Sequence, residues 1–368
     1  MRIKKSVPAR PPIGKDDRSG IRIVEMDGCW KTELVGHFPR GAPTCTLVGT
    51  REGLEEVLRP LRLVGPCDAR VLITGETGTG KNTVAELIHH MHQERRHHQF
   101  RRTNLGALVP ELAASQLFGH VKGAFTGAVK DSPGIVVESN HGTLFLDQLS
   151  DASSAVQTML LTLLEVKKVN PVGAHGVPGK DVDFRVIAGT IESPEELLDS
   201  GKVREDLFYR INEYHIELKP LRFRRSEILP MANFFLGQAR ELRKGMSVLT
   251  SIAPDAQRAL EAYHWPGNVR ELDHTIRGAV VESRVDPTAT VLDAQWLRMA
   301  PRPSHRTPSD DYETALHRFR HEWAHRLLES KLNNKDAAAA MGISQDTFRK
   351  YRDWNEPGAG EWPSGKRR

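Results

Sequence analysis

The stretch GETGTGKNT, from Gly75 to Thr83, constrains the fold of this chain more than any other. It follows the apolar run RVLIT and precedes NTVAELIHHMH, whose apolar residues recur at helical spacing. Between a strand and a helix, a G-x-x-x-x-G-K pattern predicts a loop whose backbone N–H groups surround phosphate oxygens, with Lys81 near the β and γ phosphates. The residues predicted to bind nucleotide in this loop are Gly75, Glu76, Thr77, Gly78, Thr79, Gly80, Lys81, Asn82 and Thr83.

Strand-like and helix-like segments alternate along the middle of the chain. Apolar runs at Arg70–Gly75, Gly142–Gln148 and Asp183–Thr190 are separated by segments with helical spacing. This alternation predicts an α/β fold, a P-loop parallel sheet with helices on both faces. After Pro220 the strand patterns stop and helical patterns take over, which predicts a smaller all-α lid.

An acidic residue ends one of these apolar runs. Asp147, at the end of TLFLD, is expected beside the phosphate loop, where it would hold Mg²⁺ through water and complete a site for ATP or GTP. Two nearby positions are unusual for such a site. Asn82 replaces the usual hydroxyl residue after the lysine, and Gln148 stands where a glutamate normally deprotonates the attacking water. An amide can orient water but cannot accept its proton as a carboxylate does.

The composition is that of an ordinary globular protein, with 39% hydrophobic and 27% charged residues. The net charge of +5 is compatible with a nucleic-acid partner. Three cysteines without a CxxC pair, and no long apolar run, predict a cytoplasmic protein without a membrane partner. The histidines of HHMHQERRHH, His89 and His92 among them, are expected on the exposed end of the P-loop helix and are not predicted to bind a metal.

The segment GAFTGA, which carries one phenylalanine and one threonine among glycines and alanines, is the most specific motif in the chain. With it, and with a match that runs from about Thr46 to Arg277, the sequence resembles the bacterial enhancer-binding proteins, the AAA+ activators of sigma-54 RNA polymerase. In that family the loop rises from the face of a hexamer and touches sigma-54. The resemblance implies this role, with Phe125 and Thr126 at the tip, for Gly123, Ala124, Phe125, Thr126, Gly127 and Ala128.

The same resemblance assigns roles to other residues. Arg204 and Arg210, in GKVREDLFYRIN, resemble arginine fingers, which complete a neighbouring subunit's site and so imply a ring. Arg270, in WPGNVREL, resembles the second sensor that reaches the γ-phosphate from the lid, where Trp265 is expected to pack. Two further residues match, Thr190 as the first sensor and Asn104 as the asparagine that restrains the Walker B acid. Ile191, where the family usually has asparagine, departs from the pattern as Gln148 does.

The C-terminal segment NKDAAAAMGISQDTFRKYRD is typical of a helix-turn-helix and resembles the Fis-type unit that ends many of these activators. A preceding amphipathic helix carries an apolar stripe that predicts a dimer core. Ser344 is expected to cap the second helix, and the partner would be double-stranded DNA upstream of promoters. The residues expected to face the major groove or its phosphates are Gln345, Asp346, Thr347, Arg349 and Lys350, beside the cap Ser344.

These patterns predict an AAA+ α/β core with a helical lid, followed by an all-α helix-turn-helix. The expected boundaries are an N-terminal tail without a receiver domain (1–44), the ATPase core (45–217), the lid (218–285), a linker (286–311), the DNA-binding domain (312–356) and a tail (357–368). Forty-odd residues before the core cannot hold a receiver domain, so control is expected from a regulatory protein, from expression level or from assembly.

The leading functional interpretation is a hexameric, ATP-dependent activator of sigma-54 RNA polymerase that binds upstream DNA. A second interpretation, motivated by Gln148 and Ile191, is an ATP-binding subunit that does not hydrolyse and acts in a mixed ring with an active paralogue. A third, a small-molecule kinase, leaves GAFTGA and the helix-turn-helix without a role. The sequence leaves open the promoter, the operator, the controlling signal, and whether the ring is a homo-hexamer.

Overall fold

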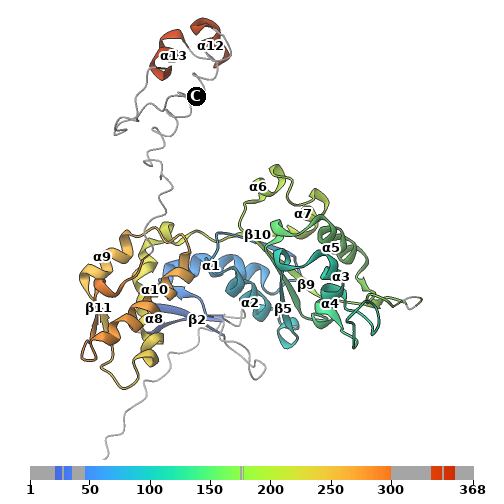
Figure 1. The fold of residues 1–368 in the computed structure, drawn as a ribbon, viewed down its shortest axis with the longest axis horizontal. Coiled ribbons are helices and arrows are strands. Elements are labelled where there is room, and N and C mark those ends of the chain that lie inside the picture. Colours follow the sequence, from blue (N-terminus) through green and yellow to red (C-terminus); the bar gives the residue numbers. More distant parts are fainter. Residues whose placement is uncertain are drawn as a thin grey trace, which may run out of the picture. The chain divides into compact units, whose positions relative to one another are not determined.

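The computed structural model describes residues 21–26, 29–34, 46–174, 176, 178–299, 333–341 and 344–352. Its contacts divide the chain into two units, Met1–Arg298 and Met299–Arg368 (Figure 1). Among the residues that the structure describes, no helix has both the length and the apolar character needed to cross a bilayer.

The first unit contains all of the described strands. They are β1 (Ile21–Met26), β2 (Cys29–Leu34), β3 (Val48–Gly49), β4 (Val71–Thr74), β5 (Phe100–Asn104), β6 (Thr143–Asp147), β7 (Lys168–Val169), β8 (Lys180–Asp181), β9 (Arg185–Thr190), β10 (Tyr214–Glu217), β11 (Ser251–Ile252) and β12 (Val291–Leu292).

The α-helices of the first unit are α1 (Arg51–Val64), α2 (Lys81–Met91), α3 (Pro110–Phe118), α4 (Gly134–Glu138), α5 (Ser154–Val166), α6 (Pro194–Asp199), α7 (Glu205–Ile211), α8 (Ile228–Gln238), α9 (Pro254–Ala262) and α10 (Asn268–Glu282). Short 3₁₀ helices lie between them, at η1 (Arg95–His97), η2 (Leu105–Ala107), η3 (Leu149–Asp151), η4 (Leu221–Phe223), η5 (Arg225–Glu227), η6 (Ala239–Arg243), η7 (Ser283–Val285) and η8 (Ala294–Trp296).

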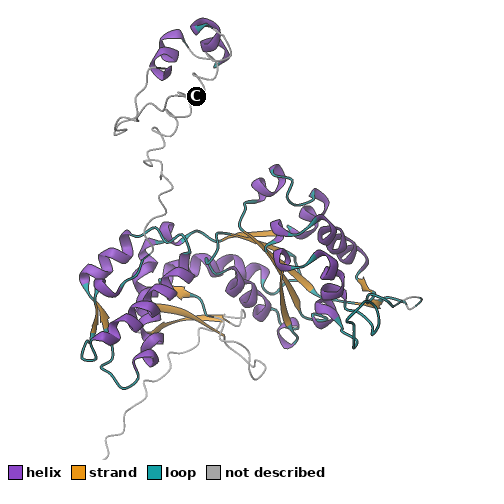
Figure 2. Ribbon diagram, viewed as in Figure 1, coloured by secondary structure: helices purple, strands orange, loops and turns teal. Residues whose placement is uncertain are grey.

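The centre of the first unit is a five-stranded sheet in the order β10-β4-β9-β6-β5, with every neighbouring pair parallel. Helices flank it, as Figure 2 shows. Parallel strands place all their carboxyl ends at one edge, where ligands of such folds bind. The predicted α/β class is confirmed, and the phosphate loop follows β4 as expected.

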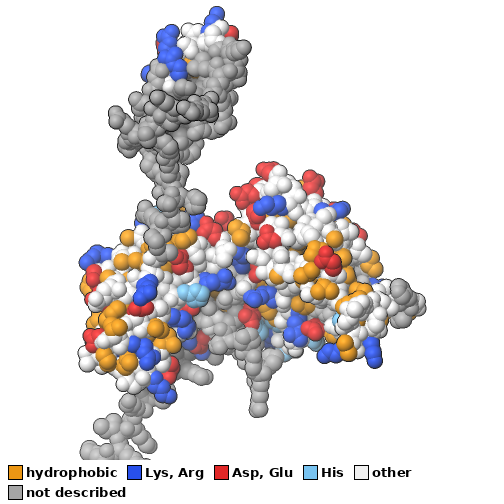
Figure 3. Space-filling model, viewed as in Figure 1, with side chains coloured by type: hydrophobic (Ala, Val, Ile, Leu, Met, Phe, Trp, Pro, Cys, Tyr) orange, Lys and Arg blue, Asp and Glu red, His pale blue; other side chains and the backbone are white. Residues whose placement is uncertain are grey.

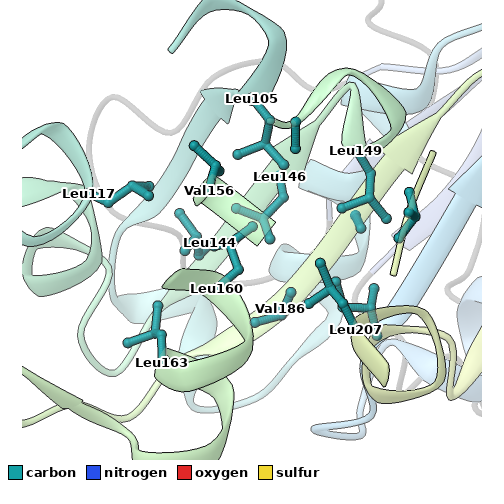
Figure 4. Packing of buried hydrophobic residues seen from close by; sticks show 14 of the residues in the cluster. Leu105, Leu117, Leu144, Leu146, Leu149, Val156, Leu160, Leu163, Val186 and Leu207 are labelled. Carbon is teal, nitrogen blue, oxygen red and sulfur yellow. The ribbon is translucent and has the colours of Figure 1, made fainter. Parts of the chain in front are cut away.

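Two apolar cores cover the two faces of this sheet. Along β6, Leu144 and Leu146 point to one face and Phe145 to the other. Figure 4 shows Leu144 and Leu146 packed against side chains of α5 such as Leu160. The opposite core packs β4 and Phe145 against α1 and α2, and includes Ile21 from the N-terminal hairpin.

Strands β1 and β2 form an antiparallel hairpin in the segment that the sequence assigned to a tail. Strand β2 then pairs with β3, with Lys31 opposite Val48. Ile21 is 1% exposed and lies in the ATPase core. The hairpin therefore extends the ATPase domain. The pairing of β2 with β3 could not be expected from periodicity. An isolated two-stranded hairpin is barely stable, so these strands form because they pack on the rest of the domain.

Helices α8, α9 and α10 form the lid that the sequence predicted. The expectation that strands stop after Pro220 is wrong in one detail, since β11 and β12 pair in parallel at Ser251 and Val291. A two-residue strand is too short to show an alternation of apolar and polar residues, so these strands are recognised only from their pairing in the structure. Beside them the buried Arg243 donates to the carbonyl oxygens of Ser283 and Asp286 and joins η6 to η7.

The second unit contains α12 (Asn334–Ala340) and α13 (Gln345–Arg352). Ala338 and Phe348 are buried between them. Ser344 Oγ accepts a hydrogen bond from the backbone N–H of Thr347 at 3.2 Å, which confirms the predicted cap. Of the expected linker (286–311), residues 286–299 are described and include β12 and η8. The rest of the linker, the amphipathic helix with its apolar stripe, the 357–368 tail and residue 342 of the expected turn lie outside the described residues.

Candidate nucleotide site and interaction surfaces

A cavity of about 800 Å³ lies at the carboxyl-terminal edge of the sheet. The phosphate loop, Asp147 at the end of β6 and Thr190 at the end of β9 all line it. Lid residues, including Arg270, form the facing wall. The structure therefore brings together nearly all the residues that the sequence assigned to nucleotide binding, as a parallel sheet requires.

The phosphate loop has the backbone form that its glycines predict. Gly75, Gly78 and Gly80 adopt φ values of 147°, 82° and 105°, which side-chain-bearing residues rarely adopt. The Nζ of Lys81 donates to the carbonyl oxygens of Gly75 and Glu76. Burial lowers the pKa of Lys81, and the nearby carboxylate of Asp147 opposes that shift. The ammonium group thus lies across the loop, where a phosphate group would replace the carbonyl oxygens as its partner.

The side chains of Asn82, Asp147 and Arg102 form a chain at one side of the phosphate loop. In the amide orientation that satisfies both neighbours, Asn82 donates to Asp147 Oδ2 at 3.2 Å and accepts from Arg102 Nη1 at 2.6 Å. Arg102 also lines the cavity. The sequence does not single it out, because the pattern of a strand does not show which helix or loop a charged side chain will contact.

Gln148 follows Asp147 in a left-handed backbone conformation with φ of 58°. Its backbone N–H donates to Asp147 Oδ1 at 3.1 Å, and its side chain lines the cavity. Asn104 lies opposite Asp147 in the paired strands, and its side-chain oxygen accepts from the N–H of Ala107 at 3.2 Å. Among the described contacts none joins Asn104 to Gln148, so the restraint of the Walker B residue stays a prediction.

Thr190, the predicted first sensor, belongs to a polar cluster that the sequence did not reveal. Its hydroxyl donates to Glu192 Oε2 at 2.7 Å, and Lys202 Nζ donates to Glu192 Oε1 at 2.7 Å. Partial burial alone would raise the pKa of Glu192, but hydrogen bonds from Lys202, Thr190 and Ser150 lower it to about 2. The carboxylate stays charged and ties the first sensor to the segment that leads into α7.

The phosphate loop is fastened to the lid through Glu76. Arg222 donates to both oxygens of this carboxylate, at 2.8 and 2.6 Å, and these bonds lower its pKa despite partial burial. Asn268, fully buried at the start of α10, donates to Glu76 Oε2 at 3.1 Å and to the Thr77 carbonyl at 3.0 Å. The sequence named the WPGNVREL motif but not this asparagine.

The lid also approaches the loop through backbone. A Cβ added to Gly78 would lie 2.2 Å from the carbonyl oxygen of Gly267, so only glycine fits there. Trp265 is fully buried, with its indole N–H donating to the Leu260 carbonyl at 2.9 Å, which confirms its predicted packing role.

The two predicted arginine fingers lie outside this chain's own cavity. Arg204 forms a two-point ion pair with Asp206, at 3.0 and 2.8 Å, and its side chain is 45% exposed. Arg210 lies 3.1 Å from Glu165. Neither is among the cavity-lining residues in the described part of the chain. This position is the one expected of residues that serve another subunit's site.

The GAFTGA segment forms a compact turn. The N–H of Gly123 donates to the Ala128 carbonyl at 2.9 Å, and both Gly123 and Gly127 have positive φ. The Phe125 ring packs edge-on against His120, 5.0 Å between centroids, and remains 38% exposed. The structure thus presents one partly exposed aromatic ring on a glycine-hinged turn.

The expected exposure of the histidines at the end of α2 is wrong for three of them. His89, His90 and His92 are buried, with exposed fractions of 1%, 5% and 7%. His89 Nδ1 lies 3.0 Å from Thr143 Oγ1, and burial lowers the pKa of His89 to about 3. The end of α2 is covered because the segment after it folds back, with Arg95 bridging Asp68 and Asp183. The helical spacing of the sequence does not indicate this cover.

The residues predicted to face DNA lie on and just before α13. Gln345, Asp346, Arg349 and Lys350 are exposed, while Thr347 is partly buried. Basic side chains gather on the visible face of this unit in Figure 3. Arg349 is paired with Asp346 at 3.5 Å, which leaves both accessible.

Comparison with known proteins identifies two domains. Residues 47–217 match the Sigma-54 interaction domain, and residues 222–311 match the AAA+ ATPase lid domain. The sigma-54-dependent transcriptional regulator SfnR of Pseudomonas fluorescens is 39% identical over 72% of this chain and 71% of its own length. NorR, the anaerobic nitric oxide reductase transcription regulator of Citrobacter koseri, is 35% identical over 83% of this chain.

The transcriptional regulatory protein ZraR of Klebsiella oxytoca is 40% identical over 64% of this chain. The present chain spans 62% of the length of NorR and 52% of the length of ZraR. Among solved structures, NtrX of Brucella abortus in complex with ADP has a TM-score of 0.62 and 28% identity, covering 85% of this chain and 69% of NtrX. The fold, the phosphate loop, the GAFTGA turn and these matches lead to one assignment: the chain belongs to the sigma-54-dependent transcriptional regulators of the AAA+ ATPase class.

Proposed function

We propose that this chain binds ATP in the 800 Å³ cavity and uses the bound nucleotide, in a ring of subunits, to act on sigma-54 RNA polymerase. The observation that carries the proposal is the joint presence of the phosphate loop and the GAFTGA turn in one domain. NtrX, whose fold is similar, has been crystallised with ADP and with ATP.

The phosphates would lie over the loop, with Lys81 moving from the carbonyl oxygens to the β and γ phosphates. Arg270, in the facing wall, would contact the γ-phosphate from the lid. The oxygen atoms of Asp147 and Asn82 fit a magnesium ion held through water, since Mg²⁺ prefers oxygen ligands. An ion held by these residues would supply positive charge that offsets part of the phosphate charge. Thr190 and Gln148 would orient the attacking water.

The proposed ring is supported by the two arginines that lie outside the cavity. In a head-to-tail ring, Arg204 or Arg210 of one subunit would reach the nucleotide of the next and stabilise charge in the transition state. Phe125 and Thr126 would contact sigma-54, and α13 would place Arg349 and Lys350 against DNA upstream of the promoter.

The test is ATP turnover by the purified protein across a range of concentrations, with assembly followed by light scattering. A specific activity that rises as rings form supports the proposal. An activity that is the same for monomer and ring would contradict the role of the fingers. Binding of the ATP-loaded protein to sigma-54, lost in a variant without the GAFTGA turn, tests the partner.

A second candidate function is an ATP-binding subunit that does not hydrolyse and works in a mixed ring. Two residues around the attacking water support it. Gln148 provides no carboxylate where the family has glutamate, and the exposed Ile191 provides no amide where the family usually has asparagine. Its arginine fingers would still serve an active neighbour. Mixing this protein with an active relative separates the two functions, because a helper subunit is silent alone and raises the relative's turnover.

A further inference from the structure

We propose that Arg102 supplies a built-in cation to the nucleotide phosphates, so that this chain binds ATP with little dependence on Mg²⁺. The inference rests on the proposed nucleotide site and deepens it. It concerns a side chain to which neither the motifs nor the family comparisons assign a role.

The position of Arg102 is the first support. It lies on β5, at the edge of the sheet, and lines the same cavity as Lys81 and Asp147. Its Nη1 is 2.6 Å from the side-chain oxygen of Asn82, the residue directly after Lys81. A guanidinium at this point faces the side of the phosphate loop where a metal ion would bridge the phosphates.

The absence of a carboxylate partner is the second support. Within the described contacts, Arg102 bonds to the neutral Asn82 and to no acidic side chain. Its neighbour Arg101, on the opposite face of the strand, pairs with Glu138 at 3.2 Å. The positive charge of Arg102 is therefore not cancelled by a local ion pair and is available to a phosphate.

The charge balance of the site is the third support. A site with Asp and Glu in the Walker B positions carries two negative charges beside those of the nucleotide phosphates, and a divalent metal offsets part of the phosphate charge. Here Gln148 removes one negative charge and Arg102 adds one positive charge. Relative to a site with glutamate at 148 and no arginine, the change is +2, the charge that Mg²⁺ brings. An arginine also binds phosphate through two parallel hydrogen bonds.

The same arrangement weakens the attraction for a metal. Asp147 Oδ2 accepts from the Asn82 amide, and Oδ1 accepts from the Gln148 N–H. A metal would have to compete with these donors and approach a fixed positive charge that repels it. The residues can hold Mg²⁺, but the site does not need it to neutralise the phosphates.

The experiment is calorimetric titration of the full chain with ATP, in excess Mg²⁺ and in excess EDTA. The variants are Arg102→Gln, Arg102→Lys and, as a matched control on the same strand, Arg101→Gln. For the wild type and Arg101→Gln we expect the dissociation constants with and without Mg²⁺ to agree within about 3-fold. For Arg102→Gln we expect EDTA to weaken binding by about 10- to 100-fold, the worth of one hydrogen bond to a charged group. Arg102→Lys should keep part of the EDTA-resistant affinity.

The outcomes separate the inference from the function on which it rests. If the wild type binds ATP in Mg²⁺ but loses it in EDTA to the same extent as Arg102→Gln, the inference is wrong and nucleotide binding stands. If Arg101→Gln behaves like Arg102→Gln, the effect comes from the edge strand and the inference is also wrong. If no protein binds ATP in either buffer, the proposed nucleotide site itself fails, and the inference with it.

Discussion

Gln148 combines a rare backbone conformation with an amide at the point where hydrolysis needs a base. Its φ of 58° aims the side chain into the cavity, next to Asp147. A glutamate in the same backbone would place a carboxylate at the same point, because the two side chains have the same length. At this position glutamine and glutamate therefore differ in the capacity to accept a proton and not in reach.

We expect Gln148→Glu to raise ATP turnover by about 10²- to 10⁴-fold, the usual contribution of a general base. The affinity for ATP should change little, since the phosphate loop is untouched. Steady-state turnover and a nucleotide titration on the same preparations measure both quantities, with Gln148→Ala as the control that removes the amide without adding a base. Equal turnover in the wild type and the glutamate variant would mean that the amide suffices.

At the scale of single elements, the buried histidines at the end of helix α2 should make the stability of the protein depend on pH. Burial lowers the pKa of His89 to about 3, and it also lowers the pKa values of His90 and His92. In the unfolded chain a histidine takes up a proton near pH 6.5. The folded protein does not, so the unfolded state binds more protons below that pH.

The free energy of unfolding should therefore be highest above pH 6.5 and should decrease as the pH falls toward 3. The loss from His89 alone is about 1.4 kcal/mol per pH unit once the pH is well below 6.5. Urea unfolding between pH 7.5 and 5 measures this slope. His89→Asn should reduce it, with His90 and His92 still contributing, and His97→Asn, at an exposed position of η1, is the matched comparison. Equal slopes in all three proteins would show that His89 is protonated in the fold.

The GAFTGA turn is a second element with a separable role. Phe125 packs on His120 and does not touch the nucleotide cavity, so Phe125→Ala should leave the affinity for ATP within about 2-fold. Binding to sigma-54 in the presence of a transition-state analogue of ATP should be lost, since the exposed ring is the largest apolar group on the turn. Size-exclusion chromatography of the mixture measures the complex, and Val129→Ala, another exposed position, is the control. A complex that survives Phe125→Ala would place the contact elsewhere.

The elements that could be predicted from the sequence are those whose signal is local. The phosphate loop, the strand ending at Asp147 and the cap at Ser344 each combine a motif with an adjacent periodic segment. The Glu192–Lys202 pair joins residues ten apart, at a spacing that no motif marks. The packing of the β1–β2 hairpin on the ATPase core and the contact of Arg102 with Asn82 depend on other segments of the chain. The burial of His89 was missed for the same reason, because a segment beyond the helix end covers it.

At the scale of the first unit, the nucleotide cavity is closed by contacts between core and lid. Glu76 is held by Arg222 and Asn268, and Gly78 meets the backbone of Gly267. A shift of the phosphate loop on nucleotide binding would therefore move the lid. In a ring this coupling would matter because Arg204 of another subunit would complete each site. Within one chain, Arg204 lies outside the cavity of that chain.

A mixed-subunit experiment tests that completion directly. The first subunit carries Gln148→Glu and Arg204→Ala, so it has an active site but no finger. The second carries Lys81→Ala, so it has the finger but cannot bind the phosphates. Each alone should be inactive. If the finger acts on the next subunit, an equal mixture should recover about a quarter of the Gln148→Glu turnover, because in a random head-to-tail ring that fraction of sites combines the two.

Adding Arg204→Ala to the second subunit is the matched control and should abolish the recovery. If the finger served its own subunit's site, neither mixture could be active, since no single chain would hold both parts. The same pair of mixtures with Arg210→Ala in place of Arg204→Ala then decides which arginine reaches the neighbouring nucleotide. Arg204 lies at the start of α7 with an exposed side chain that pairs with Asp206, two residues along the same chain segment. This position favours Arg204 over Arg210, which pairs with Glu165 on α5.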